Sequence, residues 1–266
     1  MIRDITLGQY YPTDSVLHRL DPRVKLCGTL IYIISLFLFQ SFTGYIVATV
    51  FLVSMIVLSH VPVSFMIKGL KAVFILLIFT AVLNCFLTPG RELVSFWKFT
   101  ITKEGLRLAA FMVLRIVYLI IGSSIMTLTT TPSNLTDGLE KGLGWMKILK
   151  VPVHEIAMMM SIALTFIPVL LEETDKIIKA QQARGADFES GNLIRRVRAL
   201  VPILVPLFVS AFRRANDLAI AMEARCYRGG EGRTKLHPLK YASRDVIAYI
   251  VLLLYLAAIA VVGFVL

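Results

Sequence analysis

The chain has 266 residues, of which 57% are apolar, and its mean hydropathy is +0.77. These values lie well above those of globular domains and predict an integral membrane protein. The formal net charge of +11 gathers in segments that flank apolar runs, as in cytoplasmic loops of membrane proteins, and this distribution argues against nucleic-acid binding.

The first half of the chain reads as four membrane crossings. The first 25 residues are polar and lack an apolar core, so we expect no cleavable signal peptide. Four apolar runs long enough to cross a bilayer follow, at residues 26–42, 45–61, 70–87 and 106–128. Residues 90–103 contain Trp97 and several Phe residues, and we expect a mixed loop at the membrane interface.

Arg115 lies near the middle of the fourth apolar run. An unpaired charge there is costly, so its side chain should face a helical interface or a wet cavity. An ion pair or a bond to backbone carbonyls is favoured over a direct role in transport, and Asn84 is a candidate partner.

The positive-inside bias decides how the second half is read. With the amino terminus inside, four crossings return the chain to the cytoplasm near Thr129, and the loop up to Lys150 is basic. If the run 153–171 crossed, six Lys and Arg residues would face outside. The run 199–212 is short and contains two prolines. Both runs are therefore placed against the cytoplasmic leaflet, with their full insertion as the alternative.

These interpretations define an all-α integral membrane protein with about five transmembrane helices and a cytoplasmic domain of long helices. Residues 1–128 and 245–266 form the predicted transmembrane domain, because the last apolar run, 246–266, takes the carboxyl terminus outside. Residues 129–244 form the predicted cytoplasmic or interfacial domain. Seven crossings are the alternative.

The segment 172–244 holds half of the chain's 28 Lys and Arg residues and a repeated pattern, Ala-x-x-Ala-Arg. Each copy ends a stretch of good helix formers, and Gly just past a helix end is the usual left-handed cap. We therefore predict two helix tips, each presenting an Arg beyond a rod, although solvated Arg side chains or lipid phosphate contacts explain so short a pattern equally well. The tip residues are Ala183, Arg184 and Gly185 in the first copy, and Ala224, Arg225 and Cys226 in the second.

The sequence contains no pattern of an enzyme or a metal site. Its four His residues lack metal-ligand spacing, the three Cys residues are far apart, and no phosphate-binding Gly-rich loop with Lys-Ser/Thr is present. We expect no catalytic residues, no metal and no cofactor. The apolar runs also lack the acidic cluster of an ion-coupled carrier, so energy for active transport would come from a partner.

Three motifs together resemble the transmembrane T component (EcfT) of energy-coupling factor (ECF) vitamin transporters, a branch of ABC transport related to the cobalt and biotin systems. They are the stretch from Ser15 to Leu26, the stretch from Gln182 to Phe188, and the stretch from Met222 to Gly229. The second and third resemble the paired coupling motifs. Cys226 stands where the family usually has Gly or Ser, and Cys is small enough to fit.

The resemblance implies a scaffold in a bacterial or archaeal plasma membrane. The predicted crossings place its amino terminus in the cytoplasm and its carboxyl terminus outside. The two Arg-bearing tips would dock into two ABC-type ATPases, and apolar faces would hold a small membrane subunit that binds the vitamin. Motion of the ATPases would then reach the substrate-binding subunit. The transported vitamin or metal, the sharing of the scaffold and the identity of the two ATPases stay open.

The alternative function is a self-sufficient secondary transporter or channel with Arg115 in its path. An intramembrane enzyme ranks last, because the chain offers no nucleophile and base constellation.

Overall fold

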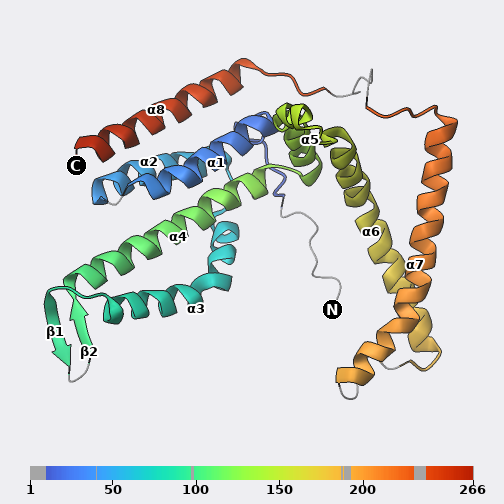
Figure 1. Cartoon of the computed structure of the whole chain (residues 1–266), viewed down its shortest axis with the longest axis horizontal. Coiled ribbons are helices and arrows are strands. Elements are labelled where there is room, and N and C mark those ends of the chain that lie inside the picture. Colours follow the sequence, from blue (N-terminus) through green and yellow to red (C-terminus); the bar gives the residue numbers. More distant parts are fainter. Residues whose placement is uncertain are drawn as a thin grey trace. The chain divides into compact units, whose positions relative to one another are not determined.

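The structure is a computed structural model that describes residues 10–39, 41–96, 99–186, 188, 193–230 and 238–265. The helices are α1 (Pro22–Leu38), α2 (Phe42–Ser59), α3 (Val63–Leu87), α4 (Lys103–Thr129), α5 (Pro132–Gly142), α6 (Val153–Ala183), α7 (Leu193–Ala224) and α8 (Ser243–Val265), with a 3-10 helix at Gly144–Leu149. Helices thus account for most of the described chain (Figure 1), and the predicted all-α membrane class is confirmed.

The chain divides into two compact units. The large unit comprises Gly8–Lys141 and Leu239–Leu266, and the small unit comprises Gly142–Pro238. The large unit contains α1 to α5 and α8, and the small unit contains α6 and α7. The assignment of one part to the membrane and the other to the cytoplasm stays a prediction, because the structure contains no bilayer.

The core of the large unit lies among α1, α2, α4 and α8, which Figure 1 shows side by side. Aromatic rings fill its centre: the rings of Phe51 and Tyr255 stack with centroids 4.1 Å apart. The Tyr32 ring lies 5.9 Å from Phe51 and 6.2 Å from Tyr255, so the three rings form one cluster. The Tyr255 hydroxyl shares a 2.8 Å hydrogen bond with Ser35 Oγ, so its polar end is satisfied inside an apolar core.

The outer faces of these helices are also apolar. Val50 on α2 is 67% exposed, Ile75 on α3 is 82% exposed and Leu253 on α8 is 64% exposed. A water-soluble protein would bury such side chains, whereas a bilayer provides an apolar solvent for them.

Five described helical segments are long and apolar enough to cross a membrane, or six if the bent α3 counts as one span. The five are within or equal to α2, α4, α6, α7 and α8. They therefore include α6 and α7, while α1 has only 17 residues. The placement of α6 and α7 against the cytoplasmic leaflet therefore stays a prediction, with their full insertion as the alternative.

The predicted mixed loop at residues 90–103 contains two strands, while its Trp97 lies outside the described residues. Strands β1 (Glu92–Phe96) and β2 (Phe99–Thr102) form an antiparallel hairpin in which Phe96 pairs with Phe99. Val, Ile, Thr and Phe dominate this stretch, and these residue types favour extended backbone. The aromatic residues of this stretch favour an interfacial loop, whereas the β-propensity of the same stretch favours the strands.

The stretch from Thr129 to Lys150 is also predicted to be a loop, but in the structure it contains α5 and the 3-10 helix. Thr131 caps α5, since its Oγ1 accepts from the Asn134 N–H at 3.3 Å, and Pro132 occupies the first helical position. A Cβ atom on Gly138 would lie 2.9 Å from Pro22 Cβ, so this Gly lets α5 approach the start of α1. The helix was missed because few of its residues are apolar.

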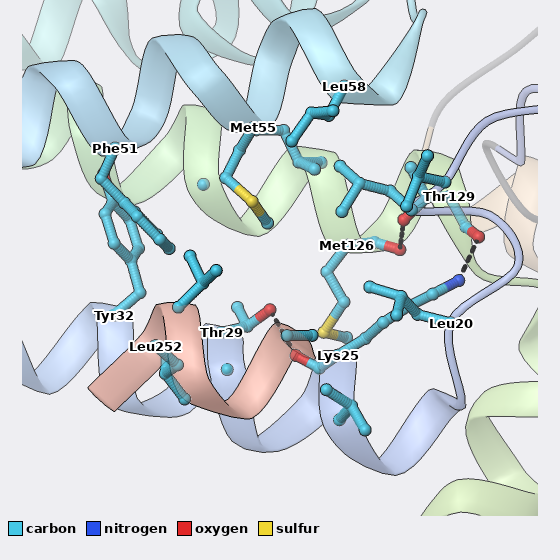
Figure 2. Close-up of a pocket in the computed structure, with 18 of the residues that line it drawn as sticks. Leu20, Lys25, Thr29, Tyr32, Phe51, Met55, Leu58, Met126, Thr129 and Leu252 are labelled. Carbon is cyan, nitrogen blue, oxygen red and sulfur yellow. Dashed lines mark hydrogen bonds between the residues drawn. The ribbon is translucent and has the colours of Figure 1, made fainter. Parts of the chain in front are cut away.

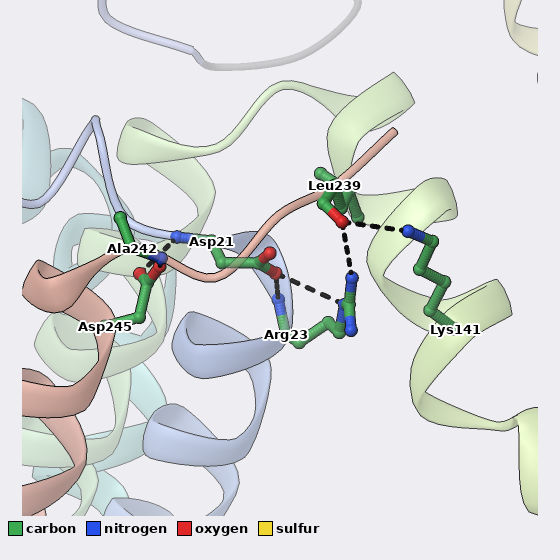
Figure 3. Close-up of polar contacts among 6 residues, drawn as sticks. All are labelled: Asp21, Arg23, Lys141, Leu239, Ala242 and Asp245. Atoms are coloured by element: carbon green, nitrogen blue, oxygen red, sulfur yellow. Dashed lines mark hydrogen bonds and ion pairs between the residues drawn. The ribbon is translucent and has the colours of Figure 1, made fainter. Parts of the chain in front are cut away.

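A polar junction fixes the start of α8 against the start of α1 (Figure 3). The buried Asp245 carboxylate accepts from the backbone N–H of Asp21 at 2.9 Å and from that of Ala242 at 2.8 Å. Close by, the Leu239 carbonyl accepts from Arg23 Nη2 at 3.2 Å and from Lys141 Nζ at 3.1 Å. The chain is thereby held at the point where it re-enters the large unit.

Candidate functional site

The first predicted tip is the carboxyl end of α6. The Gly185 N–H donates to Gln182 O at 2.9 Å, and the Ala186 N–H donates to Gln181 O at 3.0 Å. Gly185 is left-handed, with φ of 88°. This pair of bonds is a Schellman cap, which satisfies the last carbonyls of a helix and places Arg184 as the final half-helical residue.

The second tip, at the carboxyl end of α7, has the same geometry. The Cys226 N–H donates to Glu223 O at 2.8 Å, and the Tyr227 N–H donates to Met222 O at 3.0 Å. Cys226 occupies the left-handed position that Gly185 occupies in the first tip, with φ of 54°. The sequence difference between Gly and Cys therefore leaves the cap unchanged in form.

Both tips are open to contact. Arg184 and Arg225 are exposed, and so are the alanines one and four residues before each Arg. Because the alanine side chain is a single methyl group, a neighbouring surface can come close to the helix backbone at each tip. The Arg fork can then bind carboxylates or backbone carbonyls with up to five N–H groups.

Helices α6 and α7 lie side by side and run in opposite directions (Figure 1). Gln181 Nε2 donates to Pro202 O at 3.4 Å, and Arg214 Nη2 forms an ion pair with Glu173 Oε2 at 3.4 Å. Position 181 is thus close to the beginning of α7 and position 173 to a later turn, as antiparallel packing requires.

The two tips consequently lie at opposite ends of the α6–α7 pair. The first tip is level with Pro202, and the helix from Pro202 to Arg225 is roughly 35 Å long at the rise of an α-helix. At the other end, a Cβ atom on Gly230 would lie 3.0 Å from His154 Nε2, which places the segment after the second tip near the start of α6. One surface patch of ordinary size would not cover both tips.

Asp187, which belongs to the resembling motif from Gln182 to Phe188, lies outside the described residues. Within the described ranges, no group of three or more His, Cys, Asp or Glu side chains is arranged to hold a metal ion.

Arg115 contacts the end of α1. Its Nη2 donates to Phe39 O at 3.4 Å, and its guanidinium lies 5.1 Å from the centroid of the Phe37 ring. The suggested partner Asn84 instead donates to Thr80 O at 2.8 Å and lies 3.2 Å from Met112 Sδ. A cation beside the free carbonyls of a helix end is favourable, so these contacts suit a structural role.

A family described as cobalt transport protein, CbiQ, matches residues 13–236. The chain belongs to the CbiQ family. The resemblance to EcfT proteins that the three motifs suggested is confirmed with it.

Several relatives of this CbiQ-family chain carry the name energy-coupling factor transporter transmembrane protein EcfT. The protein from Clostridium kluyveri is 60% identical over 250 residues, which are 93% of either chain. The protein from Thermosediminibacter oceani is 53% identical over 249 residues, 94% of either chain. The protein from Bacillus subtilis is 48% identical over 260 residues, 97% of this chain and 98% of the relative. The similarity thus covers both tips.

Proposed function

We propose that this CbiQ-family chain is the transmembrane scaffold of an ECF-type importer and that it couples two ATPase subunits to a separate substrate-binding membrane subunit. ATP hydrolysis is assigned to the ATPases. The observation that carries the proposal is the pair of exposed Arg tips with matching Schellman caps at opposite ends of α6 and α7. The names of the relatives, all transmembrane proteins of ECF transporters, agree with it.

The spacing of the tips supports two docking sites rather than one. Each helix end is a rigid rod whose last turn is closed by its cap, so a push on the tip reaches the rest of the helix without being absorbed by a fraying end. The Glu173–Arg214 ion pair and the Gln181 contact then join the two helices. Motion of either ATPase would move the pair as one body.

An apolar stripe on α7 supports the third partner. The stripe consists of Val201, Val205, Phe208 and Phe212, which follow one another at helical spacing and are 49% to 72% exposed. Such a surface needs an apolar neighbour, and in this proposal it contacts the substrate-binding subunit at the cytoplasmic leaflet. The amino terminus and α6–α7 are placed on the cytoplasmic side and the carboxyl terminus outside.

The decisive experiment reverses the charge at each tip. Arg184→Glu and Arg225→Glu should leave membrane insertion intact but weaken binding of the ATPases by about thirtyfold or more, because losing a close charge contact in an interface costs roughly 2 kcal/mol or more. Co-purification in mild detergent and substrate uptake in proteoliposomes measure the two effects.

Matched controls make the same charge change elsewhere on the same helices. Lys176→Glu on α6 and Arg213→Glu on α7 alter exposed cations away from the tips, so association should stay near the wild-type level. Normal recovery of both ATPases with the Arg184→Glu, Arg225→Glu double variant would refute the proposal. If the ATPases differ, each single variant should lose a different one.

The alternative function, a secondary transporter or channel, requires Arg115 in the transport path. No observation favours it over the scaffold, since the Arg115 guanidinium is engaged with the Phe39 carbonyl and the Phe37 ring. Solute movement by the purified chain alone in liposomes would support the alternative.

A further inference from the structure

A half-open cavity of about 190 Å³ lies in the large unit, at one end of its helices (Figure 2). It is lined by the first turns of α1 and α8 and the last turns of α2 and α4. The segment before α1 adds Val16, Leu17 and Leu20 to the lining. The predicted topology places this end of the helices at the cytoplasmic leaflet.

The cavity wall is almost entirely apolar. Met55, Met126 and Leu252 contribute to it, and Figure 2 shows the Tyr32 and Phe51 rings at its inner end. Protein interiors hold few voids larger than a water molecule, and an apolar cavity of 150 Å³ stays dry and binds benzene. A space of this size and lining is therefore suited to a flexible hydrocarbon.

Gly28 keeps part of this space free. It faces the cavity from α1, and a Cβ atom built on it would meet no atom within 4 Å. Glycine weakens a helix interior by roughly 1 kcal/mol relative to alanine, so its presence here carries a cost that local packing does not require.

A depression of about 330 Å³, lined mainly by charged and polar residues, adjoins the cavity and shares Val16 and Arg244 with it. The other residues that line it are Asp14, Ser15, Arg19 and His60. The two spaces together present an apolar interior followed by a polar mouth, which is the order of groups along a lipid molecule.

Among the described residues at this mouth, one cation is left available. Arg19 is neutralised by Asp14, to which it donates from Nε at 3.2 Å and from Nη2 at 2.9 Å. Lys25 Nζ donates to the carbonyls of Thr129 at 2.8 Å and His18 at 3.2 Å. Within the described chain, Arg244 is exposed and makes no hydrogen bond or ion pair.

The nearby acidic groups do not offset Arg244. The Asp245 carboxylate is buried and accepts two backbone N–H groups, and the Asp21 carboxylate faces Arg23, with Oδ1 3.5 Å from Arg23 Nε. An Arg fork with no protein partner matches the oxygens of a phosphate.

From this arrangement we propose that the large unit binds one anionic phospholipid, with an acyl chain in the cavity beside Gly28 and the phosphate at Arg244. The site is independent of the tips of α6 and α7, so it stands or falls separately from the proposed coupling function. Anionic lipids of the cytoplasmic leaflet would supply the occupant.

The first test measures lipid selectivity by native mass spectrometry of the full chain, purified in detergent and stripped of lipid. Dioleoyl phosphatidylglycerol should bind one to one and more tightly than dioleoyl phosphatidylcholine, which has the same chains. Arg244→Gln should weaken phosphatidylglycerol binding about fivefold, the effect of one Arg near an anionic headgroup. Lys71→Gln, which removes an exposed cation on α3, should not weaken it. Equal affinity for the two lipids, or no effect of Arg244→Gln, overturns the assignment of the headgroup.

The second test fills the cavity. Gly28→Leu should abolish the one-to-one lipid adduct while the chain stays folded, because the new side chain enters the space meant for the acyl chain. Gly263→Leu is the matched control, since Gly263 is also a helical glycine with no atom within 4 Å of a built Cβ but lies outside the cavity. If Gly28→Leu destabilises the fold, the smaller Gly28→Ala should still reduce binding. Unchanged lipid binding in a folded Gly28→Leu chain overturns the cavity assignment.

Discussion

At the scale of single residues, the two tips have the same backbone conformation but differ in the side chain at one position. Gly185 and Cys226 occupy equivalent left-handed positions, yet only glycine adopts that conformation without a Cβ penalty. The cap bonds of the second tip are as short as those of the first, so the helix end imposes the conformation on Cys226. The second tip consequently holds local backbone strain that the first tip lacks.

Replacing Cys226 with glycine should therefore stabilise the chain. The left-handed backbone costs a non-glycine residue 1–2 kcal/mol, and the greater freedom of glycine in the unfolded chain offsets part of this, which leaves a gain of about 0.5–1 kcal/mol. Thermal unfolding in detergent measures the change.

Gly185→Ala supplies the opposite substitution at the equivalent position and should lower stability by a similar amount. A Cys226→Gly variant less stable than the wild type would show that the thiol makes a contact worth more than the strain.

At the scale of elements, the start of α8 depends on one carboxylate from its first turn. Asp245 reaches back to the Ala242 N–H, as the acidic residue of a capping box does, and also accepts from Asp21 at the start of α1. One side chain thus caps a helix and joins two elements that lie at opposite ends of the chain.

Asp245→Ala should destabilise the large unit by about 2–4 kcal/mol, because it leaves two backbone N–H groups without a partner in a buried place. Asp245→Asn keeps one amide oxygen as an acceptor and should cost about half as much. Unfolding of both variants in detergent tests the order.

The control is Asp217→Ala, at an exposed position of α7, which should change stability by less than about 0.5 kcal/mol. Equal losses for the Ala and Asn variants would contradict the role of two separate bonds.

Particular residues explain how much of this was predictable. The sequence predicts helix ends at Arg184 and Arg225, because Ala-rich stretches of helix formers stop there next to Gly or Cys. It also predicts α1 to α4, which correspond to the first four apolar runs. The bonds of Asp245 to Asp21 could not be predicted, since neither residue has a local signal that specifies a partner so far along the chain. The lengths of α6 and α7 could not be predicted either. Each helix joins an apolar run to a polar stretch, and composition alone assigns these two parts to different environments.

At the scale of the whole molecule, the predicted topology places the small unit on the cytoplasmic side of the membrane. The chain carries a natural probe there, since Cys226 is an exposed free thiol at the second tip. Its reactivity reports sidedness without any inserted tag.

A chain with Cys27→Ser and Cys85→Ser retains Cys226 as its single thiol. Expressed without ATPases that could cover the tip, it should react with a membrane-impermeant maleimide in inside-out vesicles and stay unlabelled in right-side-out cells. The positive-inside bias of the basic segment around the tips is the physical reason. Labelling of intact cells would move the small unit to the outside and would refute the predicted topology.

The antiparallel packing of α6 and α7 also has a consequence for symmetry. Two similar helix ends at opposite ends of an antiparallel pair are related by an approximate two-fold axis that passes between the helices. A partner that binds both tips in the same manner must therefore present two equivalent grooves related by a two-fold axis and roughly 35 Å apart. A dimer, of identical or of homologous subunits, meets that requirement, and a monomer with a single groove does not.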